Sequence, residues 1–443
     1  MTTKMKPSEI KWAGNIPSSW NSGHIDFFTS SRSGGTPDRD NPLFWDNGTI
    51  PWMASGEVNK SYVYETEEKI TELAVNNSNA KMIKANSVMV ALNGQGKTKG
   101  MSAILKIDST CNQSLCAFTC NENLLHYEYL YYCFQTMYQH LRMMSGDSVR
   151  DGLAASYVKK QNIPLPSIVE QQSIAKYLDV WCSEIDIIIA NMVKQVEILQ
   201  QYKKSLITET VTKGLDASAL MKDSRIEWIG QIPASWDEKR LQVVSYIRAR
   251  LGWKGLTADE YVDEGYAFLS AFNVIDDMLD LNDLNYINQF RYDESPEIKL
   301  HPGDIILVKD GAGLGKCARI DSLPFEATAN GSLAVISTGD SLEYRYLYYY
   351  FVGDVFQQFI DRLKNGMGVP HLPQGYLRKI QVPIPPLHEQ KAICDYLDER
   401  CAVVNVLIAE KQKSIETMRQ YKKSLIYEYV TGKKRVKEVT SCQ

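Results

Sequence analysis

Long apolar runs and an excess of basic residues are both missing from this sequence. No stretch approaches the roughly eighteen consecutive apolar residues of a membrane-spanning helix, and Met1–Pro7 is polar, so we expect neither a membrane span nor a secretory signal. The cytoplasm is the compartment expected by default. The formal net charge of −4 gives no overall basic signature of nucleic-acid binding, although such binding requires only a local basic surface.

Clustered metal ligands and catalytic motifs are missing as well. The nine cysteines are odd in number and scattered, which favours reduced thiols over a disulfide framework. The closest three, Cys111, Cys116 and Cys120, lack the spacing of a zinc site and are expected to be buried. The six histidines show no ligand spacing, and no serine elbow or adenine-methyltransferase motif is present. We therefore expect a chain without a catalytic activity of its own.

One glycine-rich segment, Leu92–Gly100, resembles the end of a phosphate-binding loop. Gly96, Lys97 and Thr98 match that motif, but the position of its first glycine is Ala91, and no helix pattern follows to bind phosphates. A turn between two strands is the favoured interpretation. The alternative is a basic hairpin tip at which Lys97 and Lys99 contact a nucleic-acid backbone.

The chain is an internal duplication. Blocks of similar sequence recur in the same order, with an offset that rises from 216 to 219 residues. The segments between them differ much more, and Gly34–Trp52 has no visible counterpart around Arg250–Phe268. The recurring pairs are Ile10–Trp20 with Ile226–Trp236, Val88–Gly96 with Ile305–Gly313, Tyr127–Phe134 with Tyr344–Phe351, Ile163–Pro166 with Val382–Pro385, and Gln201–Ile207 with Gln420–Ile426.

Each half ends in a long helical pattern, preceded by a proline-rich hinge and followed by Gly214 or Gly432. The first pattern, Glu170–Lys213, predicts a coiled-coil seam that is interrupted at Gln195. In the second, from Glu389 onward, Arg400 and Lys411 interrupt the seam. The apolar seam residues expected are Ile174, Leu178, Trp181, Ile185, Ile188, Met192, Leu199, Tyr202 and Leu206 in the first helix and Ile393, Leu397, Val404, Ile408, Ile415, Met418 and Leu425 in the second.

The mixed segments predict strands followed by a helix. The tyrosines of those helices are interpreted as core residues rather than as platforms for base stacking. The expected strands are Ile50–Met53, Ser87–Leu92, Met101–Ile107, Ala267–Ala271, Asp304–Val308 and Cys317–Ile320, and the expected helices are Tyr127–Met143 and Glu343–Lys364.

The repeated openings Ile16–Trp20 and Ile232–Trp236, the hinges and the helices that end in QYKKSLI together resemble the specificity subunit of a type I restriction-modification system. The resemblance covers essentially the whole chain. It implies an α+β fold in which two α/β target-recognition domains are joined by two long helices that form an antiparallel coiled coil, with a pseudo-twofold duplication. The expected limits are a first recognition domain at 1–166, a spacer helix at 167–215, a second recognition domain at 216–385, and a second spacer helix with a basic tail at 386–443.

The resemblance also implies partners. Double-stranded DNA would be read as an asymmetric bipartite site, and the helices would dock two methyltransferase subunits; ATP-dependent restriction subunits would complete the complex. S-adenosylmethionine, ATP and Mg would then be held by the partner subunits, with no cofactor in this chain. Two alternatives stay open: a coiled-coil scaffold that binds only proteins, and a nucleotide-hydrolysing enzyme, which rests on the broken phosphate loop alone.

Candidate base-contacting residues are polar side chains on the loops expected between strands. Arginine and lysine suit guanine edges or phosphates, and asparagine suits adenine. The dense basic stretch after Arg240 has two interpretations, a solvated face or a DNA contact. The candidates are Arg32, Asn59, Lys97 and Lys99 in the first half and Arg248, Arg250, Lys254, Asn273 and Lys316 in the second.

Overall fold

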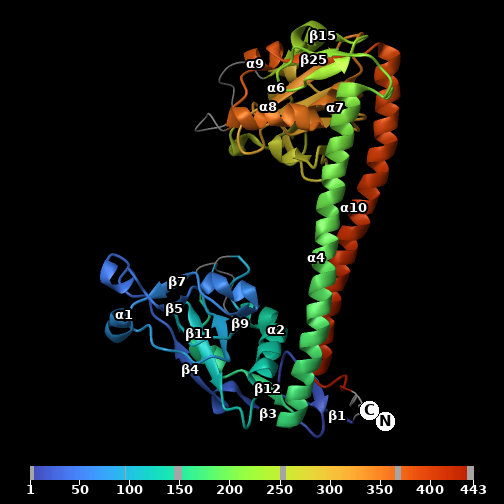
Figure 1. Ribbon diagram of the computed structural model, residues 1–443. Helices are drawn as coiled ribbons and strands as arrows, with labels where there is room; N and C mark the ends of the chain where they lie inside the picture. The colour runs from blue at the N-terminus through green and yellow to red at the C-terminus, as the bar shows by residue number, and fades with distance from the viewer. Residues whose placement is uncertain (1–3, 95, 144–151, 250–255, 365–370, 437–443) are drawn as a thin grey trace. The chain divides into compact units, whose positions relative to one another are not determined.

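The structure is a computed structural model (Figure 1) that describes residues 4–94, 96–143, 152–249, 256–364 and 371–436. It forms two compact units. The first comprises Met1–Met192 with Lys413–Gln443, and the second comprises Val193–Gln412. Each unit therefore contains one mixed α/β domain and a part of each long helix, which confirms the predicted α+β class and the duplication. The domain limits predicted at 166, 215 and 385 follow the sequence repeat and stay a prediction.

The two long helices are α4, Ile168–Lys213, and α10, Leu387–Val430. Gly214 and Gly432, which follow them, have φ values of +76° and +69°. These angles lie in the left-handed region that terminates helices and that glycine adopts without steric cost. The predicted glycine stops are therefore confirmed. Among the described residues, no helix combines the length and the apolar character that a bilayer crossing requires.

The helices pair in antiparallel orientation within each unit. In the first unit Tyr177 of α4 packs on Tyr429 of α10, and Lys422 donates to Asp186 at 2.7 Å. In the second unit Lys203 donates to Asn405 at 3.0 Å. Residue numbers thus rise along one helix as they fall along the other, as the coiled-coil prediction requires.

The predicted phase of the first seam was partly wrong. Trp181, Ile188 and Tyr202 are 42%, 41% and 53% exposed. Cys182, one residue after Trp181, and Val196, one residue after the expected interruption at Gln195, are buried. The apolar residues of α4 cover more than one stripe, so the periodicity alone left the phase ambiguous.

The second seam is more regular than its sequence suggested. Arg400 is exposed, and the buried seam position belongs to Cys401. Lys411 does occupy the seam, and it donates to Gln195 at 2.7 Å. The two polar interruptions expected in different helices are therefore hydrogen-bonded to each other.

The domain of the first unit has two sheets. The larger has the strand order β4-β11-β8-β9-β6 and the smaller has the order β10-β5-β7. Along β8, Val88 and Val90 face helix α2, whereas Met89 and Ala91 face the smaller sheet, as the alternation of side chains in a strand dictates. The bounds are β4 Thr29–Ser33, β5 Ile50–Met53, β6 Tyr62–Val63, β7 Glu68–Ile70, α1 Glu72–Asn77, β8 Ser87–Ala91, β9 Ser102–Leu105, β10 Thr110–Cys111, β11 Leu115–Cys120, α2 Tyr127–Met143 and α3 Ala155–Lys159; β1 Met5–Pro7 pairs with β2 Asn15–Pro17, and β3 Asn21–His24 with β12 Asn162–Leu165.

The domain of the second unit repeats this topology, although its larger sheet has four strands among the described residues where that of the first has five. Its sheets have the orders β16-β24-β21-β22 and β20-β17-β23, and β17 pairs parallel with β23 as β5 does with β10. The strand frame thus repeats even where the sequences show no visible similarity. The bounds are β13 Met221–Asp223, β14 Gln231–Pro233, β15 Asp237–Arg240, α5 Leu241–Val244, β16 Ser245–Arg248, β17 Tyr266–Leu269, β18 Val274–Ile275, β19 Met278–Leu279, β20 Asn285–Ile287, α6 Gln289–Asp293, β21 Asp304–Val308, β22 Cys317–Arg319, β23 Ala327–Ala329, β24 Leu333–Thr338, α7 Tyr344–Val352, α8 Asp354–Lys364, α9 Gln374–Lys379 and β25 Gln381–Ile384.

The helix predicted over Glu343–Lys364 is two helices. Gly353 ends α7 with an extended backbone, φ −62° and ψ 148°, and α8 begins at the next residue. The freed amide of Asp354 donates to the hydroxyl of Thr208 at 2.8 Å. The interpretation of the tyrosines as core residues is confirmed, since Tyr129 and Tyr346 are fully buried.

The recurring sequence motifs form the joint between each domain and its helices. Trp20 donates to Glu170 at 3.1 Å, and Trp236 donates to Glu389 at 3.0 Å. The side chains of Gln171 and Gln390 are buried and donate to the carbonyl groups of the proline hinge. The hinge carbonyls and indole N–H groups would otherwise be buried without partners, which explains why these residue types recur in both halves.

The joint also receives the end of the other helix. Tyr129 donates to the carbonyl groups of Pro164 and Val430, both at 3.1 Å. Tyr346 makes the equivalent contacts to Pro383 and Val211, both at 3.0 Å. Each domain therefore holds the start of one long helix and the last turn of the other.

Candidate nucleic-acid interface

Several loops of the first domain meet at one end of its sheets, which we call the first loop end. Main-chain hydrogen bonds hold them together: the amide of Asn112 donates to Met53 at 3.0 Å, and that of Leu92 to Ser114 at 2.8 Å. A Cβ on Gly34 would lie 2.1 Å from the Cys111 carbonyl oxygen, so the approach of these loops requires glycine there. The first loop end consists of residues 34–36, 54–59, 93–100 and 112–114, position 95 excepted.

The second domain forms an equivalent second loop end. The amide of Asn330 donates to Leu269 at 2.8 Å, and that of Lys309 to Ser332 at 2.9 Å. These bonds match those of Asn112 and Leu92 in the first domain. The second loop end consists of residues 270–273, 309–316 and 330–332, and His371, which pairs with Asp310, borders it.

One loop has the same internal bonding at both ends. The Glu57 carboxylate accepts from the amide of Ala54 at 2.9 Å, and the Asn273 side chain accepts from the amide of Ser270 at 2.9 Å. Both acceptors are buried. Between these residues, the first loop carries Gly56 and the second carries Phe272. The sequence comparison did not detect this pair of loops because few of their letters match.

The glycine-rich segment is a turn between β8 and β9, which pair antiparallel. The favoured interpretation is therefore confirmed over the phosphate-loop interpretation. Helix α2 supports the turn, since Tyr138 donates to the carbonyl of Lys97 at 2.7 Å and Arg142 to that of Gly96 at 2.9 Å. The side chain of Lys97 is exposed and belongs to the first loop end.

Lys99 was expected at an exposed hairpin tip, and the structure contradicts this. It is 8% exposed, because the turn folds back against the end of α2. Its carbonyl accepts from Arg142 at 3.1 Å. Of the two lysines of this segment, Lys97 is the exposed one.

Arg32 and Arg248 occupy equivalent strand positions rather than loops, since β4 and β16 pair with β11 and β24 in the same register. The Arg248 side chain is 9% exposed and donates to Asp304 at 2.7 Å and to Ser337 at 2.8 Å, so its guanidinium group is engaged within the domain, against the expectation of a free loop residue. Arg32 is exposed and lines a shallow depression with Lys84.

Of the other candidates, Asn59 is exposed on the first loop end, whereas Asn273 is buried. The Asn273 side chain donates to the carbonyl of Asp283 at 2.9 Å, so it organises its loop instead of reading a base. Arg250 and Lys254 lie outside the described residues. The sequence did not single out the amides of Asn93, Gln113 and Asn330, which also belong to the loop ends.

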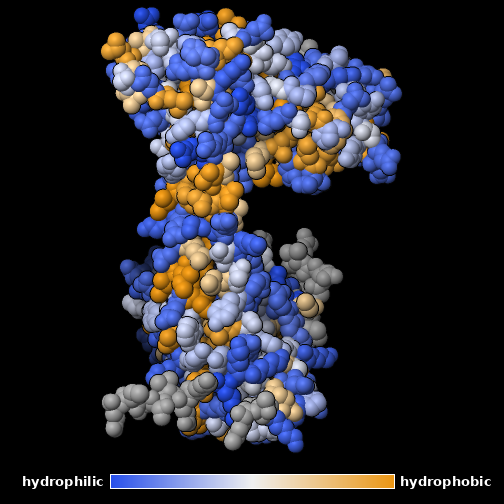
Figure 2. Space-filling view, turned by 90° about the vertical axis from the view of Figure 1, so that its right-hand side faces the viewer, coloured by the Kyte–Doolittle hydropathy of each residue, from blue (hydrophilic) through white to orange (hydrophobic). Residues whose placement is uncertain are grey.

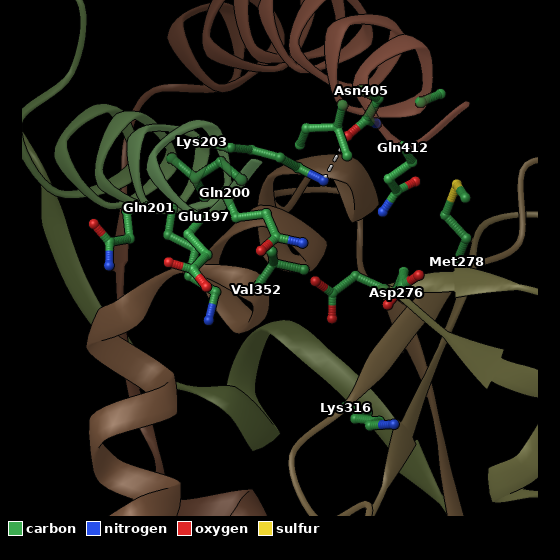
Figure 3. A pocket seen from close by; sticks show the side chains of 15 residues that line it. Glu197, Gln200, Gln201, Lys203, Asp276, Met278, Lys316, Val352, Asn405 and Gln412 are labelled. Carbon is green, nitrogen blue, oxygen red and sulfur yellow. Dashed lines mark hydrogen bonds between the residues drawn. The ribbon is translucent and has the colours of Figure 1, made fainter. Parts of the chain in front are cut away.

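Lys316 lines a cavity of about 680 Å³ between α4, α10 and the β18–β19 turn (Figure 3). Asp276 and Asp277 form that turn with φ values of +49° and +62°. Burial raises the pKa of Asp277, and Lys203, Lys204 and Lys316 oppose the rise. Because acids and bases share this cavity, it is not a groove of uniform positive potential. Within the described ranges no cluster of three or more histidine, cysteine or acidic side chains could hold a metal ion.

Apolar side chains are exposed along the long helices (Figure 2). In the first unit, Ile187 and Ile188 of α4 are 58% and 41% exposed. Their equivalents in α10, Val406 and Leu407 of the second unit, are 57% and 41% exposed. Tyr421 and Tyr202 are similarly matched, at 51% and 53%. Each unit therefore presents an equivalent apolar pair from one helix and an equivalent tyrosine from the other, and the first unit also exposes Val180 and Trp181 of α4.

Comparison with known proteins identifies this architecture. The model of the type I restriction modification DNA specificity domain matches residues 17–208 and 276–417, which is more than half of the chain and includes part of each repeat. The chain belongs to this family. It is a specificity subunit of a type I restriction-modification system, a component whose role is recognition rather than catalysis.

Relatives and a solved structure agree with this assignment. The specificity subunit of the type I restriction enzyme MjaIX of Methanocaldococcus jannaschii is 26% identical over 99% of this chain and 98% of its own. The EcoR124I/EcoR124II specificity subunit of Escherichia coli is 31% identical over 38% of this chain and 42% of its own. A chain solved in work on complex assembly and conformational transition of the type I R-M system aligns with a TM-score of 0.70 at 16% identity, covering 94% of this chain and 98% of that one. At that identity the structural likeness concerns the fold alone.

Proposed function

We propose that the two domains of this specificity subunit each read one half of an asymmetric, bipartite DNA site. The observation that carries the proposal is the pair of loop ends, which share one main-chain framework and differ in their side chains. A repeated framework gives two equivalent reading surfaces, and unlike side chains on them select unlike base sequences. Lys97, Asn59 and Lys316 are the predicted contact residues that remain exposed, and Arg32 adds a strand position.

The long helices set the gap between the half-sites and dock the methyltransferase subunits. Their apolar pairs Ile187–Ile188 and Val406–Leu407 are exposed to matching extents in the two units. Exposed apolar side chains at repeated positions are typical of protein interfaces. Because each unit has one such set, the number of methyltransferase subunits docked is two.

Chemistry on DNA belongs to the partners in this proposal. The methyltransferase subunits hold S-adenosylmethionine and modify adenine, and ATP-dependent restriction subunits, with Mg, cleave. This chain contributes sequence selection and spacing. The proposal thus requires that DNA binding by the complex depend on both loop ends.

A deletion in both long helices tests whether their length sets the gap between the half-sites. Removing residues 192–198 and 411–417 takes one heptad from each helix but keeps the Lys203–Asn405 and Asp186–Lys422 hydrogen bonds in register. The helices shorten by about 10.5 Å, or roughly three base pairs. Methylation sites mapped by sequencing should then have a gap about three base pairs shorter, and duplication of the same heptads should lengthen it by as much.

The control for the deletion is the folding and partner binding of the variants, measured by circular dichroism and by co-purification with the methyltransferase. A folded, partner-bound variant that methylates sites with the original gap would refute the proposal that helix length sets the gap.

The rival function is a protein scaffold without DNA reading. A gel-shift assay of the chain with its methyltransferase partners decides between the two. Sequence-specific binding that weakens with salt supports the proposal, because phosphate contacts release counterions. Binding that is absent at low salt would favour the scaffold.

A further inference from the structure

The most exposed large apolar side chain of the described residues is Phe272, on the second loop end. It is 90% exposed, although a phenylalanine ring is among the residues that gain most from burial. Two further apolar residues follow it on the β18–β19 hairpin, Ile275 at 46% exposure and Met278 at 61%. Met278 lines the cavity beside α4 and α10, so Phe272 is the apolar tip among otherwise polar loops.

The backbone beneath the ring is held firmly. The amide of Phe272 donates to the Ser270 hydroxyl at 3.3 Å. The buried Asn273 side chain accepts from the amide of Ser270 and donates to the carbonyl of Asp283, both at 2.9 Å. Ala271 packs against the core of the smaller sheet. The ring is thus presented by a rigid loop, which reduces the entropy lost when it enters an interface.

The equivalent loop of the first domain presents different chemistry from the same backbone. Gly56 occupies the position of Phe272, and the exposed Asn59 occupies that of Ile275. An asparagine amide pairs with adenine in the major groove, whereas apolar side chains contact the C5-methyl group of thymine. Two loops with one framework and opposite tips are what two domains need to select different half-sites.

We propose that Phe272 is a specificity-determining residue that contacts the methyl group of a thymine in the second half-site, with Ile275 adjoining it. This inference rests on the proposed function. The Gly56 loop of the first domain leaves that contact out and reads its half-site through polar groups instead.

The test uses the complete complex of this chain with its methyltransferase partners and duplexes that carry the target found by methylome sequencing. Replacing thymine by deoxyuridine at single positions removes only the methyl group. For the unaltered chain, one such replacement in the second half-site should weaken binding roughly four-fold, the value for one buried methyl-sized group. Replacements in the first half-site should have no comparable effect through this loop.

The substitution Phe272→Ala should weaken binding to the thymine duplex about ten-fold, because the apolar surface of the ring is no longer buried. It should also abolish the difference between thymine and deoxyuridine at that position. The matched control is Phe290→Ala, because Phe290 is 72% exposed in the same domain but follows β20, beside the start of β17 and away from the loop end. Affinity should be unchanged in that control. A Phe272→Ala complex that binds and discriminates like the unaltered one overturns the inference.

The reciprocal substitution is Gly56→Phe. A Cβ at Gly56 meets no atom within 4 Å and the residue does not have a positive φ, so the variant should fold. It should lower affinity for the native first half-site several-fold, because the ring occupies space fitted to glycine, while the deoxyuridine response of the second half-site persists. Unchanged affinity would contradict the equivalence of the two tips.

The inference and the proposed function fail in different ways. If the unaltered complex shows no sequence-specific binding, the proposed function fails. If it binds specifically but ignores every deoxyuridine in the second half-site, only the thymine contact of Phe272 fails.

Discussion

The two units join their domains to the long helices with the same hydrogen bonds but with different charges. Trp20 and Trp236, Tyr129 and Tyr346, and Gln171 and Gln390 have equivalent partners at nearly equal distances. These bonds satisfy buried main-chain and indole groups. They are therefore dictated by the fold itself and cannot vary freely.

The difference lies further along each long helix, nine residues after Glu170 and Glu389. Asp179 of α4 accepts from two tyrosines, Tyr62 at 2.5 Å and Tyr132 at 2.6 Å. Its equivalent in α10, Asp398, accepts from Tyr349 at 2.6 Å and forms ion pairs with Arg319 at 2.7 Å and Arg345 at 2.8 Å.

The comparison shows which part of the joint is constrained. Both units retain a carboxylate at this helix position, Asp179 or Asp398, and one tyrosine that donates to it, Tyr132 or Tyr349. The remaining donors changed from a hydroxyl to two guanidinium groups. Strictly buried polar contacts were kept, and partly exposed charges diverged.

The largest expected effect tests the shared part. Trp20→Ala and Trp236→Ala should each lower the free energy of unfolding by about 3–5 kcal/mol, because each removes a fully buried indole that also donates a hydrogen bond. Chemical denaturation measures both. The two losses should be equal within about 1 kcal/mol. A loss at only one site would show that the joints are not equivalent.

The next effect tests the divergent part. Asp398→Asn should destabilise the protein by about 1–2 kcal/mol, since two partly exposed arginines lose their charged acceptor. Asp179→Asn should cost less than about 1 kcal/mol, because an amide oxygen still accepts from tyrosine hydroxyls. Urea denaturation of both variants gives the difference, and equal values would mean that the arginines add nothing.

Lowering the pH should also reveal the contribution of the arginines that pair with Asp398. Burial alone would raise the pKa of Asp398, but hydrogen bonds from Tyr349, Arg319 and Arg345 outweigh it and hold the pKa below its ordinary value. A lowered folded-state pKa contributes stability above the unfolded value of about 3.9 and loses it as the pH falls through the folded value. The cost of Asp398→Asn should therefore shrink toward zero in that acidic range.

The smallest effect concerns a histidine that only the first unit has. Hydrogen bonds with Glu122 and Glu128 raise the pKa of His126 to about 9, while the equivalent position of the second unit is Glu343, which pairs with Arg345. The raised pKa contributes stability that is complete below the unfolded value of about 6.5 and is lost as the pH rises to the folded value.

The variant His126→Gln isolates this contribution. The difference in unfolding free energy between the unaltered chain and the variant should decrease from pH 6.5 to 9, as measured by thermal unfolding at several pH values. Glu343→Gln provides the comparison in the second unit and should show no such slope in this range. A difference that stays constant with pH would exclude a charged His126.

The sequence predicted those features that local pattern or direct repetition determines. Helix α2 and strands β5 and β21 have the expected limits, because their apolar periodicity and flanking residues are clear. The duplication and the long helices followed from repeated motifs. Identity followed from the same motifs and was confirmed by the family match.

Features that depend on distant partners were not predictable. Arg248 is a plausible DNA contact in a basic stretch, but Asp304, 56 residues away, pairs with it inside the domain. Lys99 was wrongly predicted for the same reason, since the end of α2 packs on its turn. Asn273 differs, because its side chain is held by nearby residues of its own loop, Ser270 and Asp283. The break at Gly353 had one local signal, the glycine itself, within an otherwise helical pattern.

The polar contacts of the helix seam carry a mechanical consequence. Lys422 and Lys203 are equivalent residues in the two repeats. Lys422 donates to Asp186 and Lys203 donates to Asn405, and these two acceptors are also equivalent to each other. Sliding one helix by a turn, about 5.4 Å, would move both lysines away from these acceptors. The two equivalent pairs therefore favour a single register of the antiparallel helices within each unit.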